Sequence, residues 1–250
     1  MTEQERVPAG PGEAGREPVF LLPGAVAVLS AVLIVIHLAS TLVLNAEGLV
    51  EVLFLFAFQP LRIVAAPADP TLAIPLIWTP FTHALLHGSW EHLLVNIAWL
   101  AIFATPIARR YGAWPMLAIF FISAAAGAAF FAAVTLYDGA YLIGASGGVA
   151  GLTGAAVRFI FQPVVIADHP ETGERVVLGR RLATLSDVMR DGRARTFVLI
   201  WVLLNAAVPL LPLITGTPVA VAWQAHLGGF FAGLLVVGLF ERRPHSTSSQ

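Results

Sequence analysis

Six long apolar segments constrain this chain more than any other feature of its sequence. They lie at about 20–44, 90–107, 114–136, 147–162, 196–214 and 219–240. Each is close to the length at which a helix crosses the hydrocarbon layer, and a helix satisfies its own backbone hydrogen bonds there. The composition agrees, since 58% of the residues are hydrophobic and only 12% are charged. We therefore expect an all-α membrane protein with six transmembrane helices.

The connection between the first and second segments, about 45–89, is much longer than a simple turn. It combines three acidic residues and five prolines with many apolar residues. A solvated loop would be more polar than this. We therefore expect short helical pieces that are partly embedded in the membrane.

The two ends of the chain are polar. Residues 1–19 mix glutamate and arginine with several glycines and prolines, which predicts a short disordered tail. They have neither the basic start and apolar core of a secretory signal nor the acid-poor composition of a mitochondrial presequence. The expected organisation is one six-helix domain, 20–243, followed by a short C-terminal tail, 244–250.

The placement of the arginines predicts an orientation. All fourteen basic residues are arginine, and most of them fall on one side of the expected helices. These are Arg6, Arg16, Arg109, Arg110, Arg175, Arg180, Arg181, Arg190, Arg193, Arg195, Arg242 and Arg243. Only Arg62 is expected on the other side. Positive flanks mark the cytoplasmic side, so we expect both termini and the charged connection 163–195 in the cytoplasm. The acidic residues of the N-terminal tail and the lack of a presequence pattern favour a bacterial inner (plasma) membrane as the location.

The composition also argues against several other kinds of site. The chain has no cysteine, which excludes disulfides and thiolate chemistry. Its net charge of −1 gives no electrostatic basis for binding nucleic acid. The spacing of His83, His87 and His92 could suggest zinc, but no cysteine and only one carboxylate, Glu91, lies nearby in sequence. We expect neither a metal nor a cofactor.

Three of the segments carry polar side chains at one depth. A helix rises about 1.5 Å per residue, so Ser146 and His226 lie about 22 Å from the arginine-flanked ends of their segments. His92 and Asn96 lie about 20–25 Å from the same side, and their i, i+4 spacing puts them on one helix face. Polar groups in a membrane are costly without partners and usually face the bundle interior or water. The four side chains are therefore expected to meet.

Small residues explain how these segments could approach one another. They recur at i, i+4 spacing as Gly147 and Gly151 in the fourth segment and as Gly229 and Gly233 in the sixth. Such faces allow close contact between membrane helices. Gly144 and Gly147 also flank the serine in a G-x-S-G pattern, but glycine and serine occur in membrane helices for packing alone. On this pattern alone, a packing role is the stronger interpretation.

A serine and a histidine at one depth suggest nucleophilic catalysis. The alcohol of Ser146 needs a base to become a nucleophile, and His226 within hydrogen-bond reach would supply one. The oxyanion that forms then needs fixed donors, and His92, Asn96 and the Ser146 backbone N–H are of the right type. The structural alternatives are a serine bonded within its own helix and polar side chains that only join helices.

Together these residues form a pattern that resembles the rhomboid intramembrane serine proteases. The pattern is H-x-x-x-N at His92 and Asn96, G-x-S-G at 144–147 and A-H-x-x-G-x-x-x-G at 225–233. The similarity extends over about 20–243, and the stretch 81–87 also looks like the end of the first rhomboid loop. It implies a six-helix rhomboid-like bundle with a long, partly embedded loop between the first two helices.

The resemblance also implies an activity. Ser146 and His226 would form a catalytic dyad without an acidic third member, and His92 and Asn96 would help to form the oxyanion hole. The substrate would be a transmembrane segment of another membrane protein, cut near its outer end at small residues. Water would arrive through a cavity open to the outer side. The implied partners are this substrate helix and the lipid bilayer.

Three positions depart from the usual rhomboid pattern. Ala150 stands four residues after the serine, where an aromatic residue often stacks on the histidine. Trp78 and Thr79 stand where a tryptophan–arginine pair is common in the first loop. Ala108 replaces a glutamate that is frequent near the end of the second segment. None of these changes removes a reacting group.

Two other functions remain as alternatives to an active protease. The chain could be an inactive rhomboid-like protein that binds membrane helices, which Ala150 favours and the presence of Ser146 and His226 opposes. It could also be a small transporter with the polar layer as its path. Against a transporter, the sequence shows no internal repeat and no acidic residue in the helix centres.

Overall fold

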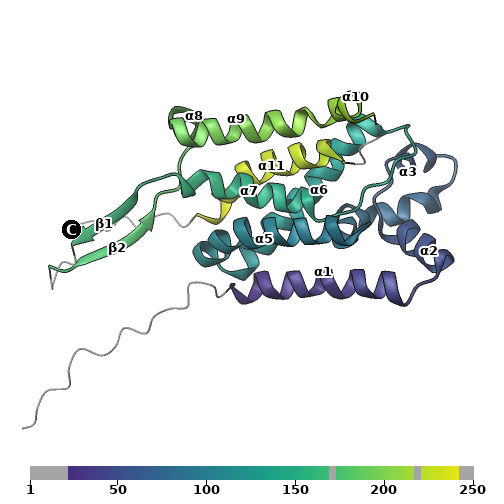
Figure 1. The fold of residues 1–250 in the computed structure, drawn as a ribbon, viewed down its shortest axis with the longest axis horizontal. Helices are drawn as coiled ribbons and strands as arrows, with labels where there is room; N and C mark the ends of the chain where they lie inside the picture. Colours follow the sequence, from purple (N-terminus) through teal and green to yellow (C-terminus); the bar gives the residue numbers. More distant parts are fainter. Residues whose placement is uncertain (1–21, 169–172, 217–220, 242–250) are drawn as a thin grey trace, which may run out of the picture.

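The computed structural model describes residues 22–168, 173–216 and 221–241. The predicted tails, 1–19 and 244–250, lie outside these ranges. The described part is a bundle of helices that run side by side along one axis, and a β-hairpin extends from one end (Figure 1).

Five stretches of the described chain are long and apolar enough to cross a membrane. They are α1 (Gly24–Leu42), α5 (Trp90–Tyr111), α6 (Ala113–Thr135) and the composite stretches Gly192–Ile214 and Trp223–Phe240. The composite stretches contain α9 (Gly192–Ala206), η3 (Val208–Leu210) and α10 (Leu211–Thr215) in the first, and α11 (Trp223–Val236) and η4 (Val237–Phe240) in the second. The predicted class, an all-α membrane bundle, is confirmed.

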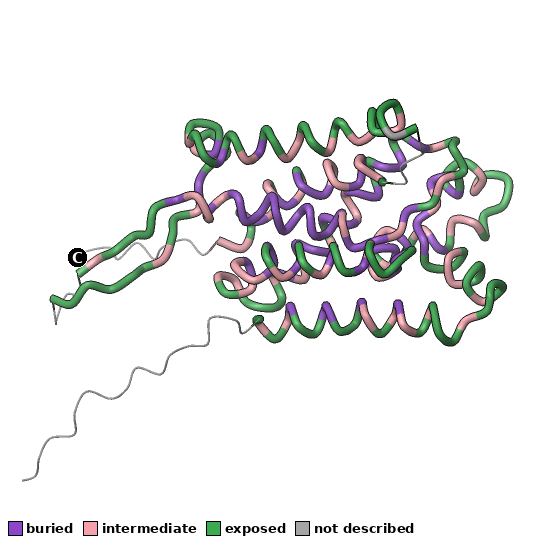
Figure 2. The backbone as a smooth tube through the Cα atoms, in the orientation of Figure 1, coloured by how far each residue is buried: buried purple, intermediate pink, exposed green. Residues whose placement is uncertain are grey.

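The predicted fourth segment forms a shorter helix, α7 (Ser146–Ile160), inside the bundle. Its 15 residues extend about 22 Å, less than a hydrocarbon core of about 30 Å. Twelve of these residues are buried, because α5, α6 and α11 all pack against α7 (Figure 2). The count of six spanning helices stays a prediction, because α7 has 15 residues whereas each of the other five stretches has at least 18.

The helices α7 and α11 approach until their backbones touch. A Cβ atom built on Gly229 would lie 2.0 Å from the Gly147 carbonyl oxygen, and one on Gly233 would lie 1.8 Å from that of Gly151. On its other side α7 meets α6, where a Cβ on Gly151 would lie 2.0 Å from Oγ of Ser123. Only glycine fits at these contacts. Such close van der Waals packing holds helices together in a membrane, where burial of apolar side chains gives little driving force.

The first loop folds into short helical pieces, as expected, at the end of the bundle away from the hairpin (Figure 1). They are α2 (Ala46–Phe56), α3 (Leu61–Ala65), η1 (Pro70–Ile77), α4 (Thr79–Thr82) and η2 (His83–Leu85). Prolines stand at the start of α3, η1 and α4. At the first turn a proline loses no helical hydrogen bond, whereas it would break a longer helix. The prolines therefore divide the loop into pieces.

A β-hairpin follows α7, and the sequence analysis did not predict it. The strand β1 (Val164–Asp168) pairs antiparallel with β2 (Arg175–Arg180), and both are rich in β-branched residues, which favour strands. The hairpin leads to α8 (Leu185–Arg190), whose first turn is closed by a capping box between Thr184 and Asp187. The described parts of the charged connection before α9, 163–168 and 173–191, therefore contain regular structure.

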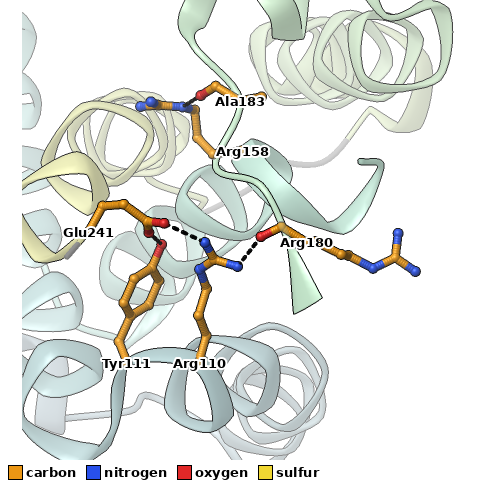
Figure 3. A network of polar contacts seen from close by, with 6 residues as sticks. All are labelled: Arg110, Tyr111, Arg158, Arg180, Ala183 and Glu241. Atoms are coloured by element: carbon orange, nitrogen blue, oxygen red, sulfur yellow. Dashed lines mark hydrogen bonds and ion pairs between the residues drawn. The ribbon is translucent and has the colours of Figure 1, made fainter. Parts of the chain in front are cut away.

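A polar network joins the hairpin to the bundle (Figure 3). Arg110 at the end of α5 pairs with Glu241 at 2.6 Å, and the Tyr111 hydroxyl donates to the same carboxylate at 2.7 Å. The Arg110 guanidinium also donates to the Arg180 carbonyl at the end of β2. Arg158 of α7 donates to the backbone just before α8. These bonds hold the base of the hairpin against α5, α7 and the end of η4.

The close contact of α7 and α11 makes Gly233 a sensitive position. We expect Gly233→Ala to lower the free energy of unfolding by about 1–3 kcal/mol or more, because the new methyl group overlaps the Gly151 carbonyl. A Cβ on Gly238, in η4 of the same stretch, would meet no atom within 4 Å, so Gly238→Ala is the matched control. Thermal unfolding in detergent measures both. Equal melting temperatures for the two variants would contradict the contact.

Candidate active site

A cavity of about 220 Å³ lies between α5, α7, α9 and α11. All four helices contribute polar side chains to it, and α5 and α9 each add a tryptophan. These residues are Asn96, Ser146, Thr153, Asn205, His226, Trp99 and Trp201. Three of the four polar side chains that the sequence places at one depth therefore line one cavity.

Ser146 begins α7 directly after a sharp turn of the backbone. Gly144 has a φ of +116° there, a conformation that residues with a side chain rarely adopt. The turn is fastened to the first loop, because the Gly144 N–H donates to the His83 carbonyl at 2.9 Å and the Ala145 N–H donates to His87 Nε2 at 3.4 Å. The first N–H groups of a helix have no acceptor within it. Ser146 therefore faces the cavity beside backbone donors.

The two residues expected to form the oxyanion hole occupy different places. Asn96 is buried and lines the cavity, and its Nδ2 donates to the His92 carbonyl one turn earlier at 3.0 Å. The amide has a second N–H for another acceptor. His92 lies against the turn before Ser146, since a Cβ atom on Gly144 would lie 2.6 Å from its ring. The structure thus brings Asn96 to the cavity and His92 to the adjacent turn.

A hydrogen bond joins the ring of His226 to a residue that the sequence analysis missed. Nδ1 of His226 lies 2.8 Å from Oδ1 of Asn205 on α9. The sequence did contain a sign of this residue, because Asn205 is the only amide side chain in the apolar segment 196–214. Polar residues in membrane segments usually have partners and a function.

Ala150 leaves space beside His226. Within the described part of the chain, no aromatic ring packs on the imidazole, and Ala150 itself lines the cavity. Phe230, in the turn after His226, stacks instead on Trp201, with ring centroids 4.3 Å apart and planes at 18°. The aromatic residue that the rhomboid pattern expects after the serine therefore has no counterpart at this ring, and Asn205 provides its polar partner.

The two histidines of the first loop, His83 and His87, contact backbone atoms close to the site. Nδ1 of His83 lies 2.9 Å from the Thr79 carbonyl, and the His87 and His92 rings meet edge to face with centroids 5.0 Å apart. Within the described ranges, no group of three His, Cys, Asp or Glu residues could hold a metal ion.

One protein-family model covers a large part of the chain. This model, the Rhomboid domain, matches residues 76–243. The chain belongs to the rhomboid family. The match includes the H-x-x-x-N pattern on α5, the G-x-S-G pattern at the start of α7 and the A-H-x-x-G pattern on α11. Rhomboids are in general serine proteases that act within membranes, and the apolar helices make this rhomboid an integral membrane protein.

The cavity of this rhomboid contains the groups that acyl transfer requires. A hydroxyl, an imidazole and an amide donor face it from three helices. Ser146 and His226 form no hydrogen bond with each other among the described atoms. Such bonds are often long in substrate-free sites and shorten when substrate binds. The geometry therefore brings a hydroxyl, an imidazole and an amide to one cavity, with no direct hydrogen bond between the hydroxyl and the imidazole in the described part of the chain.

The turn before Ser146 can be tested through Gly144. We expect Gly144→Ala to lower the melting temperature of this rhomboid more than Gly139→Ala does. Both glycines have a positive φ, but only at Gly144 would the methyl group meet another side chain, the His92 ring. The backbone at Gly144 (φ +116°) is also further from the αL region than the backbone at Gly139 (φ +67°). The difference between the two variants therefore combines greater backbone strain with the ring contact, for which overpacking predicts about 1–3 kcal/mol. Identical unfolding curves would show that the ring does not rest on this turn.

Proposed function

We propose that this rhomboid is an active intramembrane serine endopeptidase that cleaves transmembrane segments of other membrane proteins. The observation that carries the proposal is the cavity, where Ser146, His226 and Asn96 converge from three helices. Polar side chains are costly within a membrane, so their convergence indicates a function. Membership of the rhomboid family supports the same class of reaction.

In the proposed reaction Ser146 is the nucleophile and His226 is the general base. As Oγ bonds to the scissile carbonyl carbon, its proton moves to Nε2 of His226 and the carbonyl electron pair moves onto oxygen. The proton then passes from Nε2 to the leaving amine as the C–N bond breaks, which leaves an acyl-enzyme. Water next loses a proton to Nε2 as its oxygen bonds to the ester carbonyl carbon. This proton then passes from Nε2 to Oγ as the ester C–O bond breaks, which frees Ser146 and the new carboxyl terminus. These steps need no metal ion or cofactor.

Donors around Ser146 are proposed to stabilise the oxyanion. Asn96 has one amide N–H beyond its bond to the His92 carbonyl, and it already faces the cavity. The N–H of Ser146, at the start of α7, adds a backbone donor where the helix dipole favours negative charge. We propose that His92 assists from beside Gly144.

We further propose that the cavity faces the outer side of a bacterial inner (plasma) membrane, with both termini in the cytoplasm. Arg109 and Arg110 lie in the last turn of α5, at the end of the bundle where the hairpin begins. Ser146 lies at the start of α7, toward the opposite end of the bundle. Positive residues favour the cytoplasmic side. The proposed organisation is a tail at 1–19, a protease domain at 20–243 and a tail at 244–250.

Two observations favour a second candidate, an inactive rhomboid-like protein that binds membrane helices. Ser146 and His226 are not hydrogen-bonded among the described atoms, and Ala150 gives the imidazole no aromatic support. The hydrogen bond between His226 and Asn205 favours the active protease. It orients the imidazole, and a protein that only binds helices has no need of an oriented imidazole.

Labelling with a fluorescent fluorophosphonate separates the two candidates. We expect wild-type protein in detergent to be labelled, because a base makes the serine nucleophilic. Ser146→Ala and His226→Ala should both abolish labelling, since one removes the nucleophile and the other its base. Thr153→Ala, which also removes a hydroxyl at the cavity, is the matched control and should keep labelling. An unlabelled wild type with a cooperative unfolding transition would favour the inactive protein.

The oxyanion role of Asn96 gives a graded prediction. Loss of one oxyanion donor typically lowers the rate by about 10²–10³-fold, so Asn96→Ala should leave weak but measurable labelling. Leu94→Ala, at an exposed position of the same helix, is the control and should label at the wild-type rate. A rate for Asn96→Ala within about threefold of wild type would remove Asn96 from the oxyanion hole.

A further inference from the structure

Asn205 lies at the cavity without a part in the reaction proposed above. It stands near the end of α9, in an otherwise apolar stretch, and is only partly buried. Its Oδ1 contacts Nδ1 of the proposed base, on the side of the ring away from Nε2. A polar group at this place affects any proton transfer that the ring performs.

Two hydrogen bonds fix the direction in which the Asn205 amide faces. Its Nδ2 donates to the Trp201 carbonyl, one turn earlier on α9, at 2.9 Å. A carbonyl oxygen can only accept, so the NH₂ group faces Trp201 and Oδ1 faces His226. If the amide were turned over, two oxygens would face each other and the bond to Trp201 would be lost. Trp201 is itself held by its stacking on Phe230.

This direction selects one form of the neutral imidazole. The amide Oδ1 is only an acceptor, so Nδ1 of His226, at 2.8 Å, must carry the hydrogen. A neutral imidazole has one N–H, and Nε2 therefore keeps its lone pair. A general base needs that lone pair to take the proton of Ser146.

We propose that Asn205 is a positioning residue for the base of this rhomboid. It holds neutral His226 in the Nδ1–H tautomer and fixes the rotation of the ring, so that Nε2 serves Ser146. The inference rests on the proposed protease function and adds to it a third, neutral member from α9.

An amide suits this position for a physical reason. A charged side chain within a membrane is costly, whereas a neutral acceptor leaves the resting site uncharged. When His226 takes the proton, the oxygen of the amide dipole already points at Nδ1–H and stabilises the positive ring. Because Ala150 places no ring against the imidazole, this hydrogen bond is the polar contact that orients it in the described structure.

The same bond could merely fasten α9 to the bundle. Only Ala194 and Val198 of α9 are buried, so the helix packs loosely and a polar link to α11 would strengthen it. A fastening role predicts lost stability without a selective effect on the serine. A positioning role predicts a slower proton transfer with unchanged binding of the probe.

Three variants of the full chain separate these roles. Asn205→Leu removes both hydrogen bonds at similar volume, and Asn205→Asp keeps an acceptor for Nδ1 but loses the amide donor. Leu204→Ala, at an exposed position beside Asn205, controls for altered packing of α9. The measurement is the rate of fluorophosphonate labelling against probe concentration, which gives a maximal rate and a half-saturating concentration, together with the melting temperature.

We expect Asn205→Leu to lower the maximal rate about tenfold or more, the effect of losing the hydrogen bond to the His226 ring, with an unchanged half-saturating concentration. Asn205→Asp should restore the rate to within about threefold of wild type. If Asn205→Leu labels at the wild-type rate, the inference is wrong. It is also wrong if both variants lose labelling in proportion to their lower melting temperatures.

Nitrogen NMR of ¹⁵N-histidine-labelled protein tests the inference without any reaction. The His226 signals, assigned by their loss in His226→Ala, should show hydrogen on Nδ1 and a bare Nε2 in wild type. Asn205→Leu should mix the two tautomers. If the fluorophosphonate does not label the wild type, the proposed protease function fails. The NMR spectrum then still tests whether Asn205 sets the tautomer of His226. Hydrogen on Nδ1 that depends on Asn205 supports the inference, and a bare Nδ1 in wild type overturns it.

Discussion

The contact between α7 and α11 is the constraint on which the site depends. Backbone atoms meet there at two glycine pairs, Gly147 with Gly229 and Gly151 with Gly233. Close packing between membrane helices has to come from small residues, because burial of apolar side chains gives them little advantage over lipid. Ser146 lies one residue before Gly147 on α7, and His226 lies three residues before Gly229 on α11. The contact that joins the two helices therefore also sets the separation of hydroxyl and imidazole.

The walls of the cavity differ in how firmly they are held. The helix α7 is buried along most of its length among α5, α6 and α11, whereas α9 lies at the margin and buries little of its surface (Figure 2). The proposed nucleophile, Ser146, and the proposed base, His226, both stand on tightly packed helices. The amide partner of the base stands on the loosely packed one. A polar group on a lipid-facing helix must find its partner inside the bundle, and Asn205 finds it in His226.

Much of the bundle could be predicted because spanning helices need long apolar runs, which the sequence shows directly. The order of His92, Asn96, Ser146 and His226 indicated the family that the Rhomboid match supports. The hairpin could not be predicted in this way. The two strands lie in a charged connection, for which the sequence predicts only a polar segment exposed in the cytoplasm. The spacing of apolar residues that indicates the helices says nothing about which residues of this connection pair with each other. The short length of α7 was visible in the sequence, because the apolar segment 147–162 ends at Gln162 and Pro163 and differs from the helix Ser146–Ile160 by only one or two residues at each end.

Asn205 and Ala150 show where sequence reasoning ends at the site itself. A lone amide in an apolar segment indicates that a partner exists, but the partner lies 21 residues away on another helix. Ala150 indicates that one support of the imidazole is missing, without showing what stands in its place. A stacked ring fixes the plane of an imidazole and leaves its tautomer free, whereas an acceptor at Nδ1 fixes both the rotation and the position of the hydrogen. A site that has the amide in place of the ring therefore controls where its proton resides, but only while α9 stays against α11.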